Sequence, residues 1–489
     1  MKQRAWWVMR VAGATAFALG LAACGSVSRG GDEDDMPADA SAGDDGSSDD
    51  DGSDDGAEPS CSDEAQNQDE TDVDCGGSCD PCAPHKRCEV PADCSTESCV
   101  DTFCALVSGP PSWVAGPALP SLTGTMAAGL GEGIVWIVRG NRVAFFSAGS
   151  WTEVPVDDPL EFELPVSEMA VTGDGTNVWA AGGRESDGFR VSRAWGLPPG
   201  AAAWTQLDDI EPGRSSLALA VGPDGNIYAI GGSPEPSAEM SAFGSTVESY
   251  VPPPAPPVTR PWDPAPADLP FGIIDHAAAS AGGHLYVVGG RAFTGYLAST
   301  FRWKPGDAAW AAAADLTSAR ANLGATVAGD GRLYVVGGDD DSNPIDTVEA
   351  YAPEADHWFT VASLPAGGRT SLGVTLGPDG RIWAIGGSGA AAVGIVEIYG
   401  PALQLSPLQG PVGTQIQIGG TNFAANATVS IRVGSLTSPE VGTAETNDAG
   451  ALTTPVVFTV PPGTRPGIIT IHAIDDRSRF PVRREFDVN

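Results

Sequence analysis

Cysteine is absent from the last 385 residues of this 489-residue chain, and basic residues are absent from a long stretch near its start. Between Gly30 and His85 there are 20 acidic residues and no Lys or Arg, and the whole chain carries a net charge of −37. A chain this acidic repels DNA, RNA and anionic membrane surfaces, which argues against nucleic-acid binding. Histidine is also scarce, and no Gly-x-Ser-x-Gly, His-Glu-x-x-His or phosphate-loop motif stands out. The sequence therefore offers no recognisable catalytic set.

The first 23 residues have the organisation of an export signal. Basic residues precede an apolar segment, Val11 to Ala23, whose 13 residues are too few to span a bilayer. The segment ends in Leu-Ala-Ala-Cys, which resembles the lipobox of bacterial lipoproteins and implies that Cys24 is acylated. The alternative is an ordinary secretory signal. Gly25, in place of Asp, favours the outer membrane, so we expect an exported protein that is lipid-anchored in the cell envelope.

Residues 24–60 are mostly Gly, Ser, Asp and Glu, and we expect a disordered acidic linker there. Residues 61–104 contain eight cysteines, an even number that predicts a disulfide module in an oxidising compartment. They are Cys61, Cys75, Cys79, Cys82, Cys88, Cys94, Cys99 and Cys104. The sequence does not decide their pairing, and zinc binding is the less favoured alternative.

Several oxygen-bearing side chains lie close together within this module. They are Asn67, Asp69, Asp72 and Asp74. Carboxylate and amide oxygens suit Ca²⁺, but no full EF-hand pattern is present. We therefore predict no cofactor and no metal, with calcium at these four residues as a weak alternative.

A short apolar run that ends in two glycines recurs through the middle of the chain. The first glycines of five copies are Gly182, Gly231, Gly289, Gly337 and Gly386. They are spaced by 49, 58, 48 and 49 residues, and a weaker copy ends at Gly140. Runs of this length are typical of buried strands, and a fixed period of this size indicates a repeat architecture.

Each copy lies in the same local context. A dipeptide such as Asp330-Gly331 precedes it and supplies the positive φ angles of a tight hairpin. Another apolar stretch lies upstream, and a third strand and a tryptophan follow downstream. The tryptophans are Trp151, Trp204, Trp262, Trp310 and Trp358. Four strands per period make one propeller blade, and the whole pattern resembles the kelch repeat, which implies an all-β, six-bladed propeller over residues 109–400.

The two ends of this region complement each other. The last repeat has no downstream tryptophan for a fourth strand, whereas Trp113 lies upstream of the first repeat and belongs to no repeat there. We therefore predict that the strand around Trp113 completes the last blade and closes the ring, which leaves no unpaired edge. Residues 401–489 show short alternating strands with Gly/Pro turns, which predict a small β-sandwich. This part resembles the immunoglobulin-like domains of bacterial surface proteins, including the IPT/TIG type.

Two known enzyme families are also built on kelch propellers. Galactose oxidase needs a Cys bonded to a Tyr and copper ligands from two Tyr and two His, and a propeller region without Cys excludes that chemistry. Periplasmic sialic acid epimerases need only polar side chains at the mouth of the ring, so composition does not exclude them. A carbohydrate-active enzyme of the epimerase or lyase kind is therefore the alternative function.

Five arginines are expected at one mouth of the ring, because they open first strands or follow glycine pairs. They are Arg184, Arg214, Arg291, Arg320 and Arg369. A guanidinium can grip a carboxylate with two parallel hydrogen bonds, so these arginines are the candidate ligand-binding residues. Structural salt bridges are the alternative for each of them. Acidic residues near 185–187 and 339–341 share this face and oppose its positive charge.

We therefore expect a binding protein rather than an enzyme. Its partner would be a protein, a peptide or a glycan that carries a carboxylate, and the membrane would be reached through the lipid anchor alone.

Overall fold

The computed structural model describes most of the chain from residue 111 onward and some positions of the cysteine module. The described residues are 82, 88–89, 92, 94, 99–100, 103–104, 111–119, 126–139, 142–154, 166–201, 203–234, 243–252, 260–265, 267–389 and 394–489. All of them belong to one compact unit, Pro59–Asn489. None lies in an α-helix, so this part of the chain is all-β, as predicted, and has no helix that could cross a membrane.

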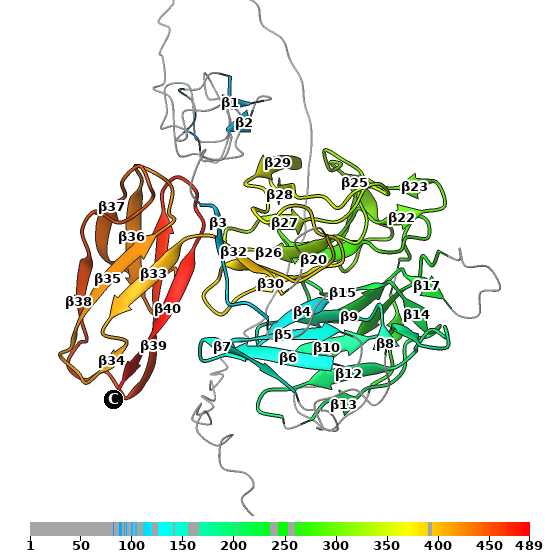
Figure 1. Cartoon of the computed structure of the whole chain (residues 1–489), viewed down its shortest axis with the longest axis horizontal. Coiled ribbons are helices and arrows are strands. Elements are labelled where there is room, and N and C mark those ends of the chain that lie inside the picture. The colour runs from blue at the N-terminus through cyan, green and yellow to red at the C-terminus, as the bar shows by residue number, and fades with distance from the viewer. Residues whose placement is uncertain are drawn as a thin grey trace, which may run out of the picture. The chain divides into compact units, whose positions relative to one another are not determined.

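Six four-stranded antiparallel sheets form the blades of a β-propeller (Figure 1). The strands of the first three blades are β4 (Ala127–Gly131), β5 (Ile134–Arg139), β6 (Arg142–Ser147) and β7 (Ser150–Glu153); β9 (Ala170–Gly173), β10 (Val178–Ala181), β12 (Ala194–Leu197) and β13 (Thr205–Gln206); and β15 (Ala218–Val221), β16 (Ile227–Ile230), β18 (Val247–Tyr250) and β19 (Asp263–Pro264). In each blade the first strand lies innermost, since the first strands of neighbouring blades lie beside one another around the ring.

The other three blades repeat this order. Their strands are β20 (Ala277–Ala281), β21 (His284–Val288), β24 (Thr300–Trp303) and β25 (Ala311–Ala313); β26 (Gly324–Val327), β27 (Leu333–Val336), β28 (Val348–Ala352) and β29 (His357–Val361); and β30 (Gly373–Leu376), β31 (Ile382–Ile385), β32 (Val396–Tyr399) and β3 (Trp113–Ala115). The sixth blade thus combines three strands from its own repeat with β3 from the beginning of the propeller. Trp113 lies opposite Tyr399, so the predicted ring closure is confirmed.

Buried side chains between neighbouring blades form the hydrophobic core. One cluster fills each of the six gaps, and the cluster between blades 5 and 6 continues into the C-terminal domain. The tryptophans of the outer strands add a polar link between blades. Trp113, Trp310 and Trp358 each donate an indole hydrogen bond to a backbone carbonyl of the preceding blade, at 2.7–3.1 Å. Each of these tryptophans therefore buries a large apolar side chain and also joins two neighbouring blades by a hydrogen bond.

Three short two-stranded antiparallel sheets lie beyond the glycine pairs. They pair β8 (Val166–Ser167) with β11 (Arg184–Glu185), β14 (Arg214–Ser215) with β17 (Ser233–Pro234), and β22 (Arg291–Ala292) with β23 (Gly295–Tyr296) in a hairpin. These small sheets surround the end of the ring at which first strands begin and second strands end. We call this end the mouth; it comprises residues 166–168, 184–190, 214–216, 233–234, 273–275, 291–296, 320–322, 339–344 and 369–371.

Residues 402–488 form a β-sandwich of two sheets. One sheet contains β33 (Ala402–Ser406), β35 (Gln415–Thr421) and β38 (Val456–Thr459), and the other contains β34 (Gln409–Gly410), β40 (Val482–Val488), β39 (Gly467–Asp475), β36 (Thr428–Val433) and β37 (Glu440–Glu445). Alternate residues of both sheets, such as Ile416, Ile418 and Ile431, are buried in the core between them. The predicted small β-sandwich is therefore present, and its resemblance to an immunoglobulin-like domain stays a prediction.

The sandwich contacts the propeller at the hairpin turns that lie opposite the mouth. Arg332, buried beside Asp330 in the turn of blade 5, donates to the carbonyl of Ser478, and Arg483 donates to the carbonyls of Pro378 and Asp379 in blade 6. These turns join first strands to second strands, so they lie at the far end of each strand from the glycine pairs. The mouth is therefore left uncovered by the sandwich.

Asn422 of the sandwich also holds the strand that closes the ring. Its side-chain amide donates to the carbonyls of Ser112 and Gly400, both at 2.8 Å, and its oxygen accepts from the Ser112 hydroxyl. Ser112 directly precedes β3, and Gly400 directly follows β32. One side chain thus fixes the two strand ends whose pairing closes the propeller.

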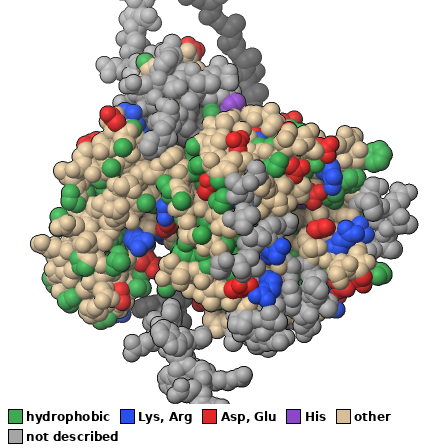
Figure 2. Space-filling model, viewed as in Figure 1, with side chains coloured by type: hydrophobic (Ala, Val, Ile, Leu, Met, Phe, Trp, Pro, Cys, Tyr) green, Lys and Arg blue, Asp and Glu red, His purple; other side chains and the backbone are tan. Residues whose placement is uncertain are grey.

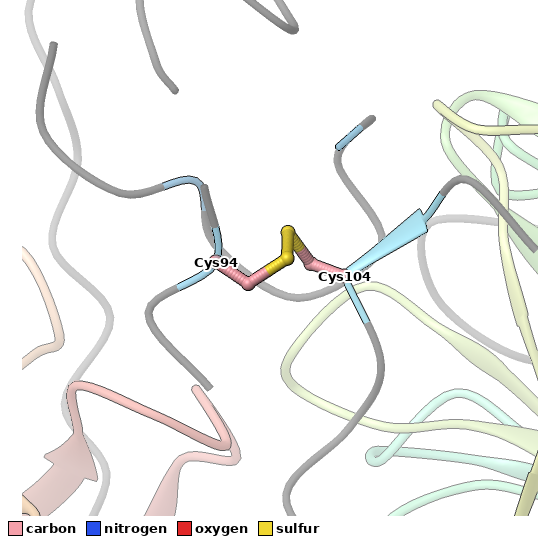
Figure 3. Close-up of a disulfide and its surroundings, with 2 residues drawn as sticks. All are labelled: Cys94 and Cys104. Carbon is pink, nitrogen blue, oxygen red and sulfur yellow. A yellow bond between two sulfur atoms is a disulfide. The ribbon is translucent and has the colours of Figure 1, made fainter. Parts of the chain in front are cut away.

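The cysteine module is described at few positions. β1 (Cys99–Val100) pairs with β2 (Phe103–Cys104), and Cys94 forms a disulfide with Cys104 (Figure 3). Cys82 and Cys88 are disulfide-bonded too. The predicted disulfide chemistry is confirmed for these four cysteines, whereas Cys61, Cys75, Cys79 and the side chain of Cys99 lie outside what the structure describes.

Trp113→Ala should lower the free energy of unfolding by about 3–5 kcal/mol, the usual cost of truncating a large buried aromatic side chain. The loss should be larger after deletion of residues 109–120, because β32 then becomes an open edge. Denaturant unfolding measures both changes. Phe293→Ala, at a site that is 88% exposed, serves as the control and should change stability by less than about 0.5 kcal/mol. Unchanged stability after the deletion would contradict closure by β3.

Candidate functional site

Three of the five predicted arginines are buried within the blades. Arg214, Arg320 and Arg369 are at most 1% exposed, and each guanidinium pairs with a buried glutamate on the third strand of its own blade. The pairs are Arg214 with Glu248, Arg320 with Glu349 at 2.5 Å, and Arg369 with Glu397 at 2.6 Å. Each arginine also donates to the carbonyl of the first glycine of its own pair. All three guanidinium groups thus have their partners inside the fold.

This geometry corrects the expectation that Arg214, Arg320 and Arg369 hold a ligand carboxylate. A buried guanidinium that already pairs with a carboxylate has neither the charge nor the access to bind a second one. Burial lowers the pKa of each arginine, and the neighbouring glutamate opposes that shift. The alternative interpretation, structural salt bridges, therefore describes these three residues.

The backbone of the same arginines joins neighbouring blades. The second glycine of one blade donates its N–H to the arginine carbonyl of the next, from Gly183 to Arg214 and from Gly290 to Arg320, both at 2.8 Å. Both glycines of each pair have positive φ, and a Cβ on Gly289 would lie 2.7 Å from the Arg320 carbonyl oxygen. The glycine pair is therefore required by a close backbone approach as well as by its conformation.

Blade 4 replaces the ion pair with an apolar pair. Ile273 accepts the hydrogen bond from Gly232 and so holds the arginine position, while Phe301 holds the glutamate position, opposite Val287 as Glu349 is opposite Val335. His276 lies three residues after Ile273 and holds the position of Leu217, Leu323 and Leu372 in other blades. The arginine and the glutamate therefore occur together or are replaced together. That joint pattern, visible in the repeat, is the signal our sequence reasoning missed.

A belt of backbone hydrogen bonds runs around the mouth. Its members are non-glycine residues with φ of 52–56°, namely Glu168, Ser216, Asp275, Asn322 and Ser371. Each N–H from Ser216 onward donates to the carbonyl of the preceding member, and Met126 in blade 1 donates to Ser371. Left-handed backbone is uncommon for such residues and is often found at functional sites. Here it presents five polar side chains to one ring.

The two remaining arginines lie at this belt and are accessible. Arg291 donates to Asp275 at 3.1 Å, and Arg184 lies 4.0 Å from Glu168; both arginine side chains are 42% exposed. Burial raises the pKa of Asp275, while Ser216 and Arg291 oppose the rise. The predicted mouth location is thus correct for Arg184 and Arg291, although both are paired with acids. Sequence reasoning did not identify Glu168 or Asp275.

Asp339 is the centre of a second polar group at the mouth. Its carboxylate accepts hydrogen bonds from the Tyr296 hydroxyl at 2.8 Å, from the Asn322 amide at 2.9 Å and from the Thr370 hydroxyl at 2.5 Å. Burial, followed by Asp339, raises the pKa of Tyr296 to about 12. Three neutral donors from three blades therefore hold this carboxylate in place without neutralising it.

Exposed phenylalanines project from two mouth hairpins. Phe189 is 64% exposed on the segment after β11, and Phe293 is 88% exposed between β22 and β23. Figure 2 shows charged and hydrophobic side chains close together over the part of the propeller where Figure 1 places β14, β17, β22 and β23. Exposed aromatic side chains beside polar groups are typical of recognition surfaces.

A central channel of about 640 Å³ runs between the innermost strands. It is lined by the innermost strands, mostly with Ala, Val, Gly and Thr, and Arg483 of the sandwich lies at its lining too. His276 lines it directly below the belt and is buried, and neither ring nitrogen has a hydrogen-bond partner, although the Ile230 carbonyl lies near the ring. Burial lowers the pKa of His276 to about 4, so the imidazole is neutral at physiological pH.

The cysteine module contains a compact group of potential metal ligands. The sulfurs of Cys88, Cys94 and Cys104 lie within 4.8 Å of one another, the one compact group of potential ligands among the described residues. All three form disulfides, so none offers a thiolate to zinc. Cys24 and the weak calcium candidates lie outside the described residues; these candidates are Asn67, Asp69, Asp72 and Asp74.

The chain matches the kelch motif family at residues 274–317 and 321–365, which correspond to blades 4 and 5. Kelch-like protein 33 from Homo sapiens is 43% identical over 109 residues, which are 22% of this chain and 20% of that protein. Beta-scruin from Limulus polyphemus is 39% identical over 98 residues, 18% of this chain and 11% of that protein. The chain thus spans a fifth or less of these relatives. Together with the six blades, these matches identify a kelch-repeat β-propeller.

A solved structure titled "Structure of YjhT" is also similar to the chain. It is 16% identical, has a TM-score of 0.47, and the match covers 60% of this chain and 97% of that one.

Arg320→Ala should lower the free energy of unfolding by about 3–5 kcal/mol, because Glu349 is left buried without its partner. The double change Arg320→Ile with Glu349→Phe copies blade 4 and should recover much of that loss. Arg184→Ala removes an exposed arginine and should cost less than about 1 kcal/mol. Denaturant unfolding of the three variants provides the measurement, and wild-type stability of Arg320→Ala would refute the structural role.

His276 should make stability depend on pH. Its pKa is about 4 in the fold against 6.5 ordinarily, so the unfolded chain binds a proton first as the pH falls. The neutral imidazole therefore contributes fully to stability above pH 6.5. The free energy of unfolding should fall by about 3 kcal/mol as the pH drops from 6.5 toward 4. Because carboxylates also titrate there, the measurement is the difference in unfolding free energy between wild type and His276→Leu. A difference that stays constant from pH 7 to pH 4 would contradict the buried neutral imidazole.

Proposed function

We propose that this chain is an envelope-anchored binding protein whose propeller mouth holds a protein partner. The carrying observation is the pair of exposed phenylalanines, Phe189 and Phe293, on the mouth hairpins. Aromatic side chains are enriched among the residues that anchor protein interfaces. The kelch matches support the same proposal, because they fall on two blades that surround this mouth.

The position of the sandwich supports binding at the mouth. Its contacts use the turns around Asp330 and Asp379, at the opposite end of the strands. The sandwich consequently leaves the mouth accessible. The cysteine module and the acidic linker would then serve as a spacer between the anchor at Cys24 and the propeller.

A displayed random-peptide library selected on the full chain tests binding at the mouth. We expect peptides that bind wild type and lose at least about tenfold in affinity on Phe189→Ser with Phe293→Ser, a change of about 1.4 kcal/mol. The matched control replaces two exposed apolar residues of the sandwich, Val457→Ser with Ile468→Ser, and should bind as wild type does. Selected peptides that depend on the sandwich residues instead would refute the mouth as the site.

Anchoring is tested by Cys24→Ala. The lipobox-like Leu-Ala-Ala-Cys predicts that this change removes the acyl chains and releases the protein from the membrane fraction. Fractionation of cells that express the two forms, together with mass spectrometry of residue 24, measures it. A variant that stays in the membrane fraction, or a wild type without acylation at Cys24, would contradict the proposal.

One observation favours a second function, a carbohydrate-active enzyme of the epimerase or lyase kind. Asp275 is a half-buried carboxyl with a raised pKa beside Arg291 and Ser216, an environment that suits a proton donor. Conversion of free or linked sialic acid by the wild-type chain, abolished by Asp275→Asn, would favour this function over binding alone.

A further inference from the structure

We infer that the partner presents a basic segment to the mouth, with Lys or Arg next to apolar side chains. This inference rests on the proposed function and reverses the sign of the ligand charge that the five arginines predict. It follows from charge pairing and from the exposed aromatic residues.

The mouth carries more acidic than basic side chains. The three buried arginines are paired with glutamates and therefore add no net charge to the mouth. The remaining described arginines at this end are Arg139 at the end of β5, Arg184, Arg190 and Arg291, against seven acids: Glu168, Glu185, Asp187, Asp275, Asp339, Asp340 and Asp341. Arg184 and Arg291 are each paired with an acid of the belt. The mouth is therefore acidic, and it attracts cations.

The Asp339 carboxylate is oriented by neutral hydrogen-bond donors in a way that suits a cation. Hydroxyls of Tyr296 and Thr370 and the amide of Asn322 orient its carboxylate. No cationic side chain of the described residues forms a salt bridge with it. An oriented carboxylate whose charge is not compensated costs little reorganisation when a Lys or Arg approaches. Asp340 and Asp341 extend the same negative surface and are exposed.

Aromatic side chains lie on the same mouth segments as these acids. Phe293 lies on the hairpin that also carries Tyr296, and the Tyr296 ring already lies 6.0 Å from the Arg291 guanidinium carbon. Aromatic faces attract Lys and Arg, and they also pack against apolar side chains. Phe189 offers the same chemistry across the mouth. A segment that alternates basic and apolar residues fits both features.

The channel adds an unpartnered polar group below the acids. His276 is 94% buried, being 6% exposed, and its two ring nitrogens have no hydrogen-bond partner. It follows Asp275 of the belt and lines the channel. A neutral imidazole has one donor and one acceptor nitrogen, so this ring does not itself select the sign of the ligand charge. An acidic segment would, however, meet the carboxylates above it.

Two fluorescent 12-residue peptides test the inference on the full chain. One repeats Arg, Leu and Gly, and the other has Glu in place of each Arg. Fluorescence anisotropy at physiological salt should show binding of the basic peptide and none of the acidic one. Asp339→Asn with Asp341→Asn should weaken the basic peptide about tenfold. The matched control, Glu440→Gln with Glu485→Gln on the sandwich, removes the same charge and should change affinity less than about twofold.

The outcomes separate this inference from the proposed function. Preference for the acidic peptide would overturn the inference and leave binding at the mouth intact. An equal loss in the mouth variant and in the sandwich control would mean nonspecific attraction and would also overturn it. Failure of both peptides overturns the basic segment, whereas the proposed function fails only if the library yields no peptide that depends on Phe189 and Phe293. Melting temperatures within a few degrees of wild type show that the variants are folded.

Discussion

The close approach of each first strand to the glycine pair of the preceding blade is the constraint on which this structure depends. At that point an N–H of one blade meets a carbonyl of the next, as Gly290 meets Arg320, and a Cβ on the adjacent Gly289 would lie 2.7 Å from that carbonyl oxygen. This backbone contact between neighbouring blades, which we call the joint, recurs around the ring. At the periphery, the outer tryptophans link neighbouring blades through indole hydrogen bonds. Blades that bury little surface individually thus become one closed core.

The same joint decides the role of the buried arginines. Because the backbone must pass the glycines, the side chain at this position points into its own blade, where it must be apolar or must bring a counter-charge. Blades 3, 5 and 6 use Arg and Glu, whereas blade 4 uses Ile273 and Phe301. A buried ion pair is often no more stabilising than a well-packed apolar pair. That equivalence explains why both solutions occur in one ring.

The sequence predicted those features that repeat with a fixed period. Strand order, glycine pairs and closure through Trp113 follow from spacing, because the same geometry must recur in every blade. The site was predicted less well. Counting Arg320 as a free charge ignored Glu349, which lies 29 residues away and meets it only after the third strand pairs with the second. The belt conformation of Asp275 and the exposure of Phe293 depend on hairpins that have no periodic signal.

Rigid joints beneath exposed hairpins therefore form the basis of the proposed binding function. Hydrogen exchange of the intact chain, followed by mass spectrometry, tests this division most directly. Amides in residues 285–290 and 333–338, which contain the glycine pairs, should exchange only through global unfolding, while those in residues 292–296 and 340–344 exchange much faster. Rapid exchange of the glycine-pair segments, at the rate of the hairpins beside them, would contradict the account.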